Sequence, residues 1–455
     1  MFGDSRRDRR FGKMLERLAQ RPSGKVTDVF WRAAERQGAY DFLEHSHVSA
    51  EAVQWQAAAA TGRQCANFAE VFVPLDGSSL ALTEKQAGSK GFGRVGADAN
   101  HGRGLKMLNA IALGPEGQTI GVLAQCFWAR QEERVDEKEY RPLKERESWR
   151  WHEAFESAQR ALAENAPQTK LHVLADQEAD AAPLMLRVLE AGCDFTIRSP
   201  GTRRVRIGGK KVDVRPHLEA KRPIGTKTVK VTAKSDRAAR EAKLKVRAAR
   251  VTLVLRDHLT KGKSRDVELS VVWAREERPP ADAEPLEWLV YTTTPVKTAA
   301  EAMAVLQRYT YRWRIEDFHR VLKSGGGCVE DSQLRSRQAM IKWATLHAMV
   351  AARAQRLRDA ARATPEAPAQ TELADAEIDA LILLKTQSKR RTEATVTKDT
   401  LTLAKAVRYI GDVGGFAVTG VSTKMPGTTI ITRGLERVLQ AAEMLQLLKD
   451  AGRLR

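Results

Sequence analysis

The chain has 455 residues, 42% of them hydrophobic, and carries a formal net charge of +19 with a pI near 9.9. This length exceeds one ordinary domain, so about two to four domains are expected, and the hydrophobic content excludes a disordered protein. The sequence has no run of about 18 apolar residues, which argues against a membrane-spanning helix. No apolar stretch follows the charges of the N-terminus, so a signal peptide is not expected and the protein is predicted to be cytoplasmic.

The four cysteines are far apart and form no Cys-x-x-Cys pair. They are expected to be buried or free thiols in a reducing cytosol, so neither a zinc site nor a disulfide network is predicted. The charge, in contrast, is clustered. Residues 199–250 contain 17 Lys/Arg against 4 Asp/Glu, and residues 1–25 contain 8 against 3. Such clusters are typical of surfaces that bind a polyanion, and nucleic acid is the partner we expect.

Residues 1–60 are predicted to form a helical DNA-binding domain. Basic side chains cluster on its first helix, and they are Arg6, Arg7, Arg9, Arg10 and Lys13. Residues 61–198 then alternate between strand-like and helix-like segments. Strands are expected at 68–75, 106–113, 121–128, 171–175 and 194–198, with a turn at 114–117 and helices at 148–165 and 181–191.

Three strands, a helix, a strand, a helix and a strand follow one another in the order of the RNase H-like fold, which has a mixed sheet covered by helices on both faces. The fold class we predict is therefore α/β. It consists of an RNase H-like core (61–198 and 295–364), a β-rich insertion (199–294) and a C-terminal helical dimerisation domain (371–455).

Residues 309–323 read Tyr-Thr-Tyr-Arg-Trp-Arg-Ile-Glu-Asp-Phe-His-Arg-Val-Leu-Lys and contain no helix breaker, so one helix is predicted. Four polar side chains would share one face of it, namely Tyr309, Arg312, Glu316 and Lys323. A carboxylate can hold a divalent cation, and the two cations can hold phosphate oxygens. The alternative is a solvated face with an i,i+4 ion pair, which contributes about 0.2–0.5 kcal/mol.

Two further carboxylates, Asp76 and Asp176, are predicted at the ends of strands, where function gathers in open α/β sheets. Both could instead be turn residues. Together with Glu316 they are hard oxygen ligands that suit two Mg²⁺ or Mn²⁺ ions. Two such ions held roughly 3.5–4 Å apart promote in-line displacement at phosphorus. The prediction is a phosphodiester-cutting or phosphodiester-joining enzyme.

These motifs resemble those of bacterial cut-and-paste transposases of the insertion sequence 4 family, the transposon five transposase type. The resemblance rests on Val73–Leu80, on Asp176–Asp180, and on a Tyr-x2-Arg-x3-Glu-x6-Lys pattern that this chain fits at Tyr309, Arg312, Glu316 and Lys323. Shorter similarities extend it over nearly the whole chain.

The resemblance implies a DDE triad of Asp76, Asp176 and Glu316 that binds two divalent ions and cuts double-stranded DNA at transposon ends. It implies nicking, hairpin formation and opening, and strand transfer into target DNA by a homodimer in a synaptic complex, without a membrane. It assigns phosphate contacts to Tyr309, Arg312 and Lys323. It also implies a DNA contact by Arg198 and a place for a flipped base at Trp288, and it implies a bacterial protein associated with the nucleoid.

The chain also departs from the family pattern. It begins close to Gly3, so a short segment found in relatives is expected to be missing, and Gln177 stands where many relatives have Arg. The alternative function is therefore a catalytically silent DNA-binding inhibitor of transposition.

Overall fold

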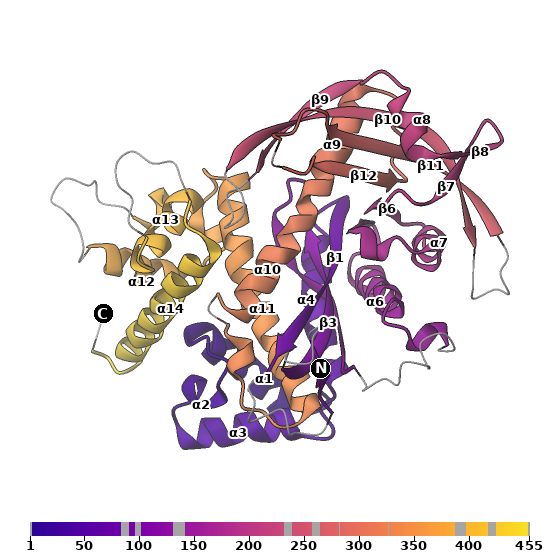
Figure 1. The fold of residues 1–455 in the computed structure, drawn as a ribbon. Helices are drawn as coiled ribbons and strands as arrows, with labels where there is room; N and C mark the ends of the chain where they lie inside the picture. The colour runs from indigo at the N-terminus through magenta and orange to yellow at the C-terminus, as the bar shows by residue number, and fades with distance from the viewer. Residues whose placement is uncertain are drawn as a thin grey trace. The chain divides into compact units, whose positions relative to one another are not determined.

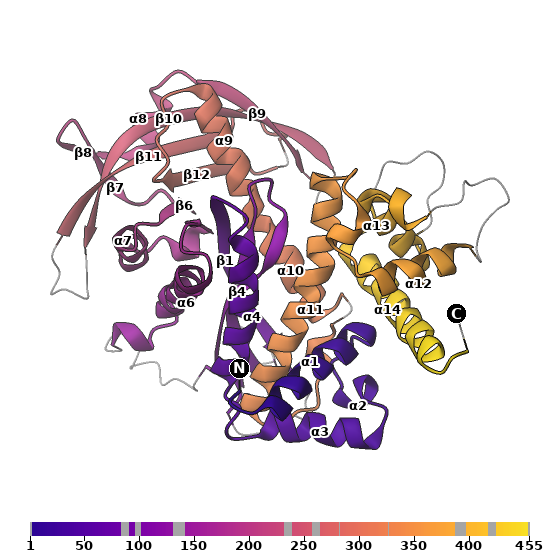
Figure 2. The ribbon, with the colours of Figure 1, turned by 180° about the vertical axis from the view of Figure 1, so that it is seen from behind.

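The structure is a computed structural model, and the residues that it describes are 2–82, 91–95, 102–130, 142–231, 239–256, 264–281, 283–325, 327–386, 397–416 and 425–453. The chain forms two compact units. Figures 1 and 2 label their helices and strands. Unit 1 contains Met1–Cys65, Gly77–Lys138 and Arg314–Arg455, and unit 2 contains Ala66–Asp76 and Glu139–Trp313. The division into five predicted domains stays a prediction.

The N-terminal part of unit 1 is helical, as predicted. Its helices are α1 (Ser5–Gln20), α2 (Val26–Val29), α3 (Ala33–Glu44) and α4 (Ala50–Cys65). Helix α1 begins where the Asp4 side chain accepts a hydrogen bond from the Arg6 backbone N–H, which satisfies one of the free donors of the first turn. It buries Met14 and Leu18. The Trp343 indole donates to the Gly24 carbonyl at 2.8 Å and so fixes this region to a long helix of the same unit.

That long helix is α11 (Arg337–Ala363), and it packs with α4 against the strand β4. The strands of unit 1 form an antiparallel arrangement of β2 (Gly93–Arg94), β3 (Arg103–Leu113) and β4 (Thr119–Trp128). The last part of β1 (Glu70–Ala81) lies beside β3, and the backbone of Gly104 approaches Leu80 so closely that no Cβ would fit. The predicted turn at 114–117 joins β3 and β4, with Gly117 at φ +74°.

The C-terminal part of unit 1 is helical, as predicted. It consists of α12 (Asp375–Thr386), α13 (Leu403–Val413) and α14 (Thr428–Asp450), which share one apolar core with the end of α11. The glycines and proline of residues 411–427 also predict a break between helices. This stretch begins inside α13, and its part from 417 to 424 lies outside the described residues.

Unit 2 is built on a large mixed sheet. Its strand order is β1-β5-β6-β12-β11-β10-β7-β8, with β9 also paired to β10. Strands β1, β5 and β6 are parallel, and β12, β11 and β10 continue antiparallel. The new strands have these bounds: β5 Lys170–Ala175, β6 Asp194–Arg198, β7 Arg204–Ile207, β8 Lys210–Asp213, β9 Gly225–Val231, β10 Arg240–Arg256, β11 Ser264–Glu276 and β12 Glu287–Thr292.

The helices of unit 2 are α6 (Trp149–Asn165), α7 (Ala182–Glu190), α8 (Val214–Glu219) and α9 (Ala299–Tyr309). The predicted helices at 148–165 and 181–191 are confirmed, and so are the strands that follow each of them. Between β6 and α9 the structure is rich in strands, as predicted for 199–294. Helix α9 begins with a capping box between Thr298 and Glu301 and buries Val305 and Leu306 in the core that covers this part of the sheet.

Two predictions about local structure are wrong. Asp76 does not end its strand, because β1 continues to Ala81. The pairing of β1 with β5, however, ends two residues before Asp76, at the pair Pro74 and Leu174. Residues 309–323 are also not one regular helix. A 3-10 segment, η4 (Thr310–Trp313), separates α9 from α10 (Arg314–Lys323). A 3-10 turn places residues i and i+3 directly above one another, and Tyr309 and Arg312 are both buried there.

Candidate active site

Three of the predicted site residues occupy aligned positions on the parallel strands of unit 2. Pro74 is paired with Leu174, so Asp76 and Asp176 both lie two residues beyond the last pair of β1 and β5. Ala175 is paired with Ile197, and continuing that register aligns Asp176 with Arg198. Aligned residues of neighbouring strands project from the same face, and such strands lie about 4.8 Å apart. The fold therefore gathers the two predicted carboxylates and one predicted cation.

Asp176 is held by the turn that follows β5. Its Oδ1 accepts a hydrogen bond from the Glu178 backbone N–H at 2.9 Å, which caps the short 3-10 helix η3 (Gln177–Ala179). One of the two oxygens is thereby oriented, and the residue remains half-exposed.

Asp76 faces Arg312. An Arg312 Nη1 lies 3.8 Å from Asp76 Oδ2, and the two side chains are 10% and 16% exposed. At this distance and burial the pair is less screened than a surface ion pair. The guanidinium also lies over the Trp313 ring, 5.8 Å from its centroid. Arg312 is therefore fixed in place beside the first carboxylate.

Tyr309 lies within the electrostatic reach of Arg312, Arg198 and Asp176. Burial raises the pKa of its phenol to about 12; the charges of Arg312 and Arg198 and a hydrogen bond to Arg312 oppose this rise, and the charge of Asp176 adds to it. All three charges thus act on one phenol. The Tyr309 hydroxyl stays protonated at any working pH and can donate a hydrogen bond.

An aromatic cluster lies next to Tyr309. Trp288 contacts Tyr309 with centroids 6.3 Å apart and Trp313 at 5.2 Å. Trp288 is only 3% exposed and belongs to an apolar core, whereas Trp313 is 36% exposed. Sequence reasoning chose Trp288 and missed Trp313, although Trp313 follows Arg312 directly. In this structure the accessible ring is that of Trp313, and the predicted DNA contact of Trp288 stays a prediction.

Arg198 is partly fixed by the backbone of β12. Its Nη2 donates to the Glu287 carbonyl at 3.1 Å, and the side chain is half-buried. The hydrogen bond orients the guanidinium at the end of β6 and leaves its other donors to meet a ligand.

Glu316 and Lys323 belong to unit 1, on α10. Glu316 is in the first turn of the helix and exposed, and Lys323 is its last residue. Lys323 Nζ lies 3.4 Å from Glu330 Oε1, and the same oxygen accepts from the Ala81 N–H at 2.8 Å. Glu330, which sequence reasoning missed, thereby ties the lysine to the end of β1.

Buried polar contacts hold α10 against the strands of unit 1. The His319 ring bonds the Asn109 amide at 3.0 Å, and Asn109 accepts from Gln125 at 3.0 Å. Burial lowers the pKa of His319 to about 3, so the ring is neutral and serves as an anchor. This anchoring orients the exposed side of α10, which carries Glu316.

The predicted arginines of α1 differ in their freedom. Arg6 is well exposed and pairs with Asp4 at 3.2 Å, and Arg9 is exposed. Arg7 reaches the Phe2 carbonyl and His45, each at 3.4 Å. Arg10 packs its guanidinium on Gly38, where a Cβ would clash. Arg6 and Arg9 are therefore the more accessible cations.

The carboxylate oxygens of Asp76 and Asp176 suit a divalent cation such as Mg²⁺ as ligands. Both are carboxylates, neither is fully buried, and the register brings them side by side. Hard cations of this kind take oxygen ligands and keep some of their waters. Another group close enough to hold a metal, Glu70, His172 and Asp194, contains none of the three predicted metal ligands.

Comparison with protein families gives two matches. Residues 1–48 match the family described as transposase DNA-binding, and residues 152–352 match the family described as transposase DDE domain. The chain thus has a DNA-binding domain and a DDE domain, which support a transposase, a DNA-binding and DNA-cleaving enzyme. Asp176 and Glu316 lie inside the second match, and Asp76 precedes it. Within the described residues, no helix is long and apolar enough to span a membrane.

Proposed function

We propose that the protein is a cut-and-paste DNA transposase of the insertion sequence 4 type, and that Asp76, Asp176 and Glu316 form its catalytic triad. The observation that carries the proposal is the alignment of Asp76 with Asp176 on neighbouring parallel strands, beside the buried guanidinium of Arg312. Glu316 follows Arg312 by four residues in the motif that carries the family resemblance.

An RNase H-like core agrees with the strand pairs in each unit. Strand β4 pairs with β3, and β3 lies beside the end of β1. The start of β1 pairs parallel with β5, and β5 parallel with β6. Three antiparallel strands followed by two parallel ones is the order that we expect for this core. The strands β7 to β12 follow as the proposed β insertion.

Asp76, Asp176 and Glu316 would hold two Mg²⁺ or Mn²⁺ ions. When bound, such ions activate the attacking oxygen and stabilise the leaving oxygen at the scissile phosphate. The three carboxylates have to stay ionised to do this. Arg312, 3.8 Å from Asp76, places a positive charge beside that carboxylate.

The remaining residues would bind and orient the DNA end. Arg312 presents a planar fork that matches two phosphate oxygens, and its preorganisation lowers the entropy lost on binding. Tyr309 would donate its hydroxyl to the same backbone, and Arg198 and Lys323 would add charge. Trp313 offers a partly exposed ring on which an unstacked base could lie during hairpin formation, with Trp288 behind it.

Helix α14 supports the proposed homodimer. Met444 and Leu447 lie on it, three residues apart and therefore on one face, and they are 58% and 51% exposed. Large exposed apolar side chains that cluster in this way are typical of association surfaces. A pair of such chains would hold two transposon ends, with residues 1–60 on the terminal repeats and the basic β insertion on flanking DNA. In a bacterial cell the enzyme would work in the cytoplasm, at the nucleoid.

The test is cleavage of a linear duplex that carries the terminal inverted repeat of the source element, with Mg²⁺ or Mn²⁺ compared with EDTA, on a denaturing gel. The proposal predicts metal-dependent nicks at the repeat boundary, followed by a hairpin product. Tight, salt-sensitive binding without cleavage in either metal would contradict it and would favour the inhibitor function.

A further inference from the structure

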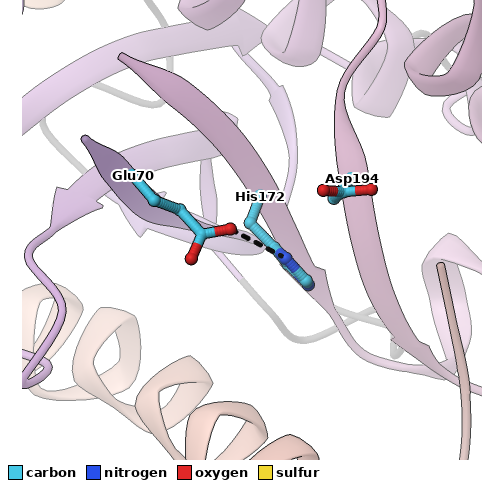
Figure 3. A group of neighbouring side chains, drawn as sticks. All are labelled: Glu70, His172 and Asp194. Carbon is cyan, nitrogen blue, oxygen red and sulfur yellow. Dashed lines mark ion pairs between the residues drawn. The ribbon is translucent and has the colours of Figure 1, made fainter. Parts of the chain in front are cut away.

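Three polar side chains meet at the beginning of the parallel strands of unit 2. Glu70 opens β1, His172 is the third residue of β5, and Asp194 opens β6 (Figure 3). One ligand atom from each lies within 4.8 Å of the others. This group belongs to no motif that the sequence singled out, and the proposed DNA chemistry does not use it.

The orientation of the His172 ring is the most informative feature of the group. The ring is almost completely buried, and its Nε2 lies 2.9 Å from Thr196 Oγ1. Thr196 in turn bonds Thr292 at 2.8 Å. The other ring nitrogen, Nδ1, faces Glu70 Oε1 at 3.7 Å. A histidine that binds a metal through one nitrogen usually donates its other N–H to a fixed acceptor, and the Thr196 hydroxyl oxygen can accept from Nε2 here.

We propose that Glu70, His172 and Asp194 bind a divalent transition-metal ion of the Zn²⁺ class. Imidazole nitrogen and carboxylate oxygen are both ligands of Zn²⁺, and three such ligands would leave the fourth tetrahedral position to a water. The 3.7 Å between His172 Nδ1 and Glu70 Oε1 is close to the separation that two ligands of one ion require, about 3.4 Å for metal–ligand bonds near 2.1 Å in a tetrahedron. The proposal does not depend on the proposed function.

The electrostatics of both carboxylates agree with a cation site. The neighbouring His172 ring has the largest of the effects that lower the pKa of Glu70. Burial opposes ionisation of Asp194, yet hydrogen bonds from Lys170 and Thr293 leave its pKa lowered overall. Both side chains are therefore ionised at neutral pH, as a metal ligand has to be.

The site is distinct from the proposed catalytic carboxylates. Asp76 lies six residues beyond Glu70 on β1, and Asp176 lies four residues beyond His172 on β5. At about 3.3 Å per residue these separations are roughly 20 Å and 13 Å. An ion here would tie together the beginnings of β1, β5 and β6, and Asp76, Asp176 and Arg198 lie further along the same three segments.

Lys170 is the natural competitor of the ion. Its ammonium pairs with Asp194, and its side chain is 54% exposed, so it can turn into solvent when a metal arrives. Removing this charge should therefore strengthen metal binding, whereas an ordinary structural ion pair gives no reason for such an effect. The expected gain is up to about fivefold in affinity, which is the upper range for a partly exposed pair.

The experiment titrates chelator-treated full-length protein with Zn²⁺, and in parallel with Co²⁺, whose visible absorption reports coordination geometry. We expect His172→Gln and Glu70→Gln each to bind one Zn²⁺ ion fewer per chain than the parent. With Co²⁺, each should lack the intense absorption bands of tetrahedral coordination. Lys170→Gln should bind that ion more tightly. Asp176→Asn should leave it in place, which separates this site from the catalytic one.

Glu156→Gln is the matched control, since its carboxylate lies 3.6 Å from Nδ1 of the buried His152. It should bind as the parent chain does. The proposal is overturned if His172→Gln and Glu70→Gln keep the stoichiometry and the spectrum of the parent. It is also overturned if Lys170→Gln binds no more tightly, because Asp194 would then not be a ligand.

Discussion

Replacing Arg312 with alanine should reduce cleavage of transposon ends much more than binding to random duplex. Its guanidinium is nearly buried, 3.8 Å from Asp76 Oδ2, and stacked near Trp313. The raw attraction at that distance is about 4 kcal/mol for an effective dielectric constant near 20, and desolvation cancels much of it. A preorganised, charge-assisted hydrogen bond to phosphate contributes about 1.5–3 kcal/mol, so cleavage should fall about 10- to 150-fold.

The assay is single-turnover cleavage of a labelled end duplex, together with gel-shift binding to random duplex of the same length at 0.1 M salt. One lost phosphate contact should weaken random binding by less than about tenfold under these conditions. Arg312→Lys keeps the charge and loses the fork, so it should cleave at an intermediate rate. Arg308→Ala is the control, because this arginine also lies over a ring, that of Phe72 at 5.4 Å, and is assigned no phosphate.

Two results would refute this reasoning about Arg312. If cleavage and random binding fell by the same factor, the residue would be a general DNA contact. If Arg312→Ala cleaved ends at the normal rate, the guanidinium would serve only to balance the charge of Asp76. A thermal melt of each variant separates either result from simple unfolding.

Three further predictions concern stability, pH and assembly. Trp288→Ala should lower the free energy of unfolding by about 3–5 kcal/mol in chemical denaturation, because it leaves a cavity in a core. Trp313→Ala should lower it by about 1 kcal/mol and chiefly reduce the hairpin yield on the denaturing gel. Equal losses of stability would refute the distinction. Burial lowers the pKa of His347 from 6.5 to about 3, so only the unfolded chain takes up this proton as the pH falls below 6.5. Stability should then drop by about 1.4 kcal/mol per pH unit down to pH 3, and denaturation of His347→Gln should lack that part of the slope. Replacing Met444 and Leu447 with Glu should shift the DNA-bound protein from dimer to monomer in light scattering, and an unchanged mass would exclude α14 as the interface.

Much of the fold can be predicted from local sequence patterns. The short apolar runs that became β5 and β6 are bounded by turn residues, and the helices between them have caps or proline at their starts, so order and type follow from periodicity. The end of β1 was misjudged because Asp76, Gly77 and Ser78 are typical of turns. Pairing with β3 keeps them extended, and a single sequence does not show that pairing.

The candidate site was predictable only in part. Tyr309, Arg312 and Glu316 are recognisable by their spacing, yet the 3-10 segment between them depends on burying Tyr309 and Arg312 together. Which tryptophan is exposed depends on the sheet beneath Trp288, so local alternation could not decide it. The group of Glu70, His172 and Asp194 comes from three strands separated by about 100 and 20 residues, and only their register brings it together.

The most direct test of the central claim compares the parent chain with Asp76→Asn, Asp176→Asn and Glu316→Gln, each isosteric and differing by one charge. End cleavage in Mg²⁺ and binding to the same end duplex are measured side by side. If the three carboxylates form the catalytic centre, every variant should bind the end at least as tightly as the parent and cut it at an undetectable rate. Normal nicking by any one of them would contradict the assignment of that residue and, with it, the proposed triad.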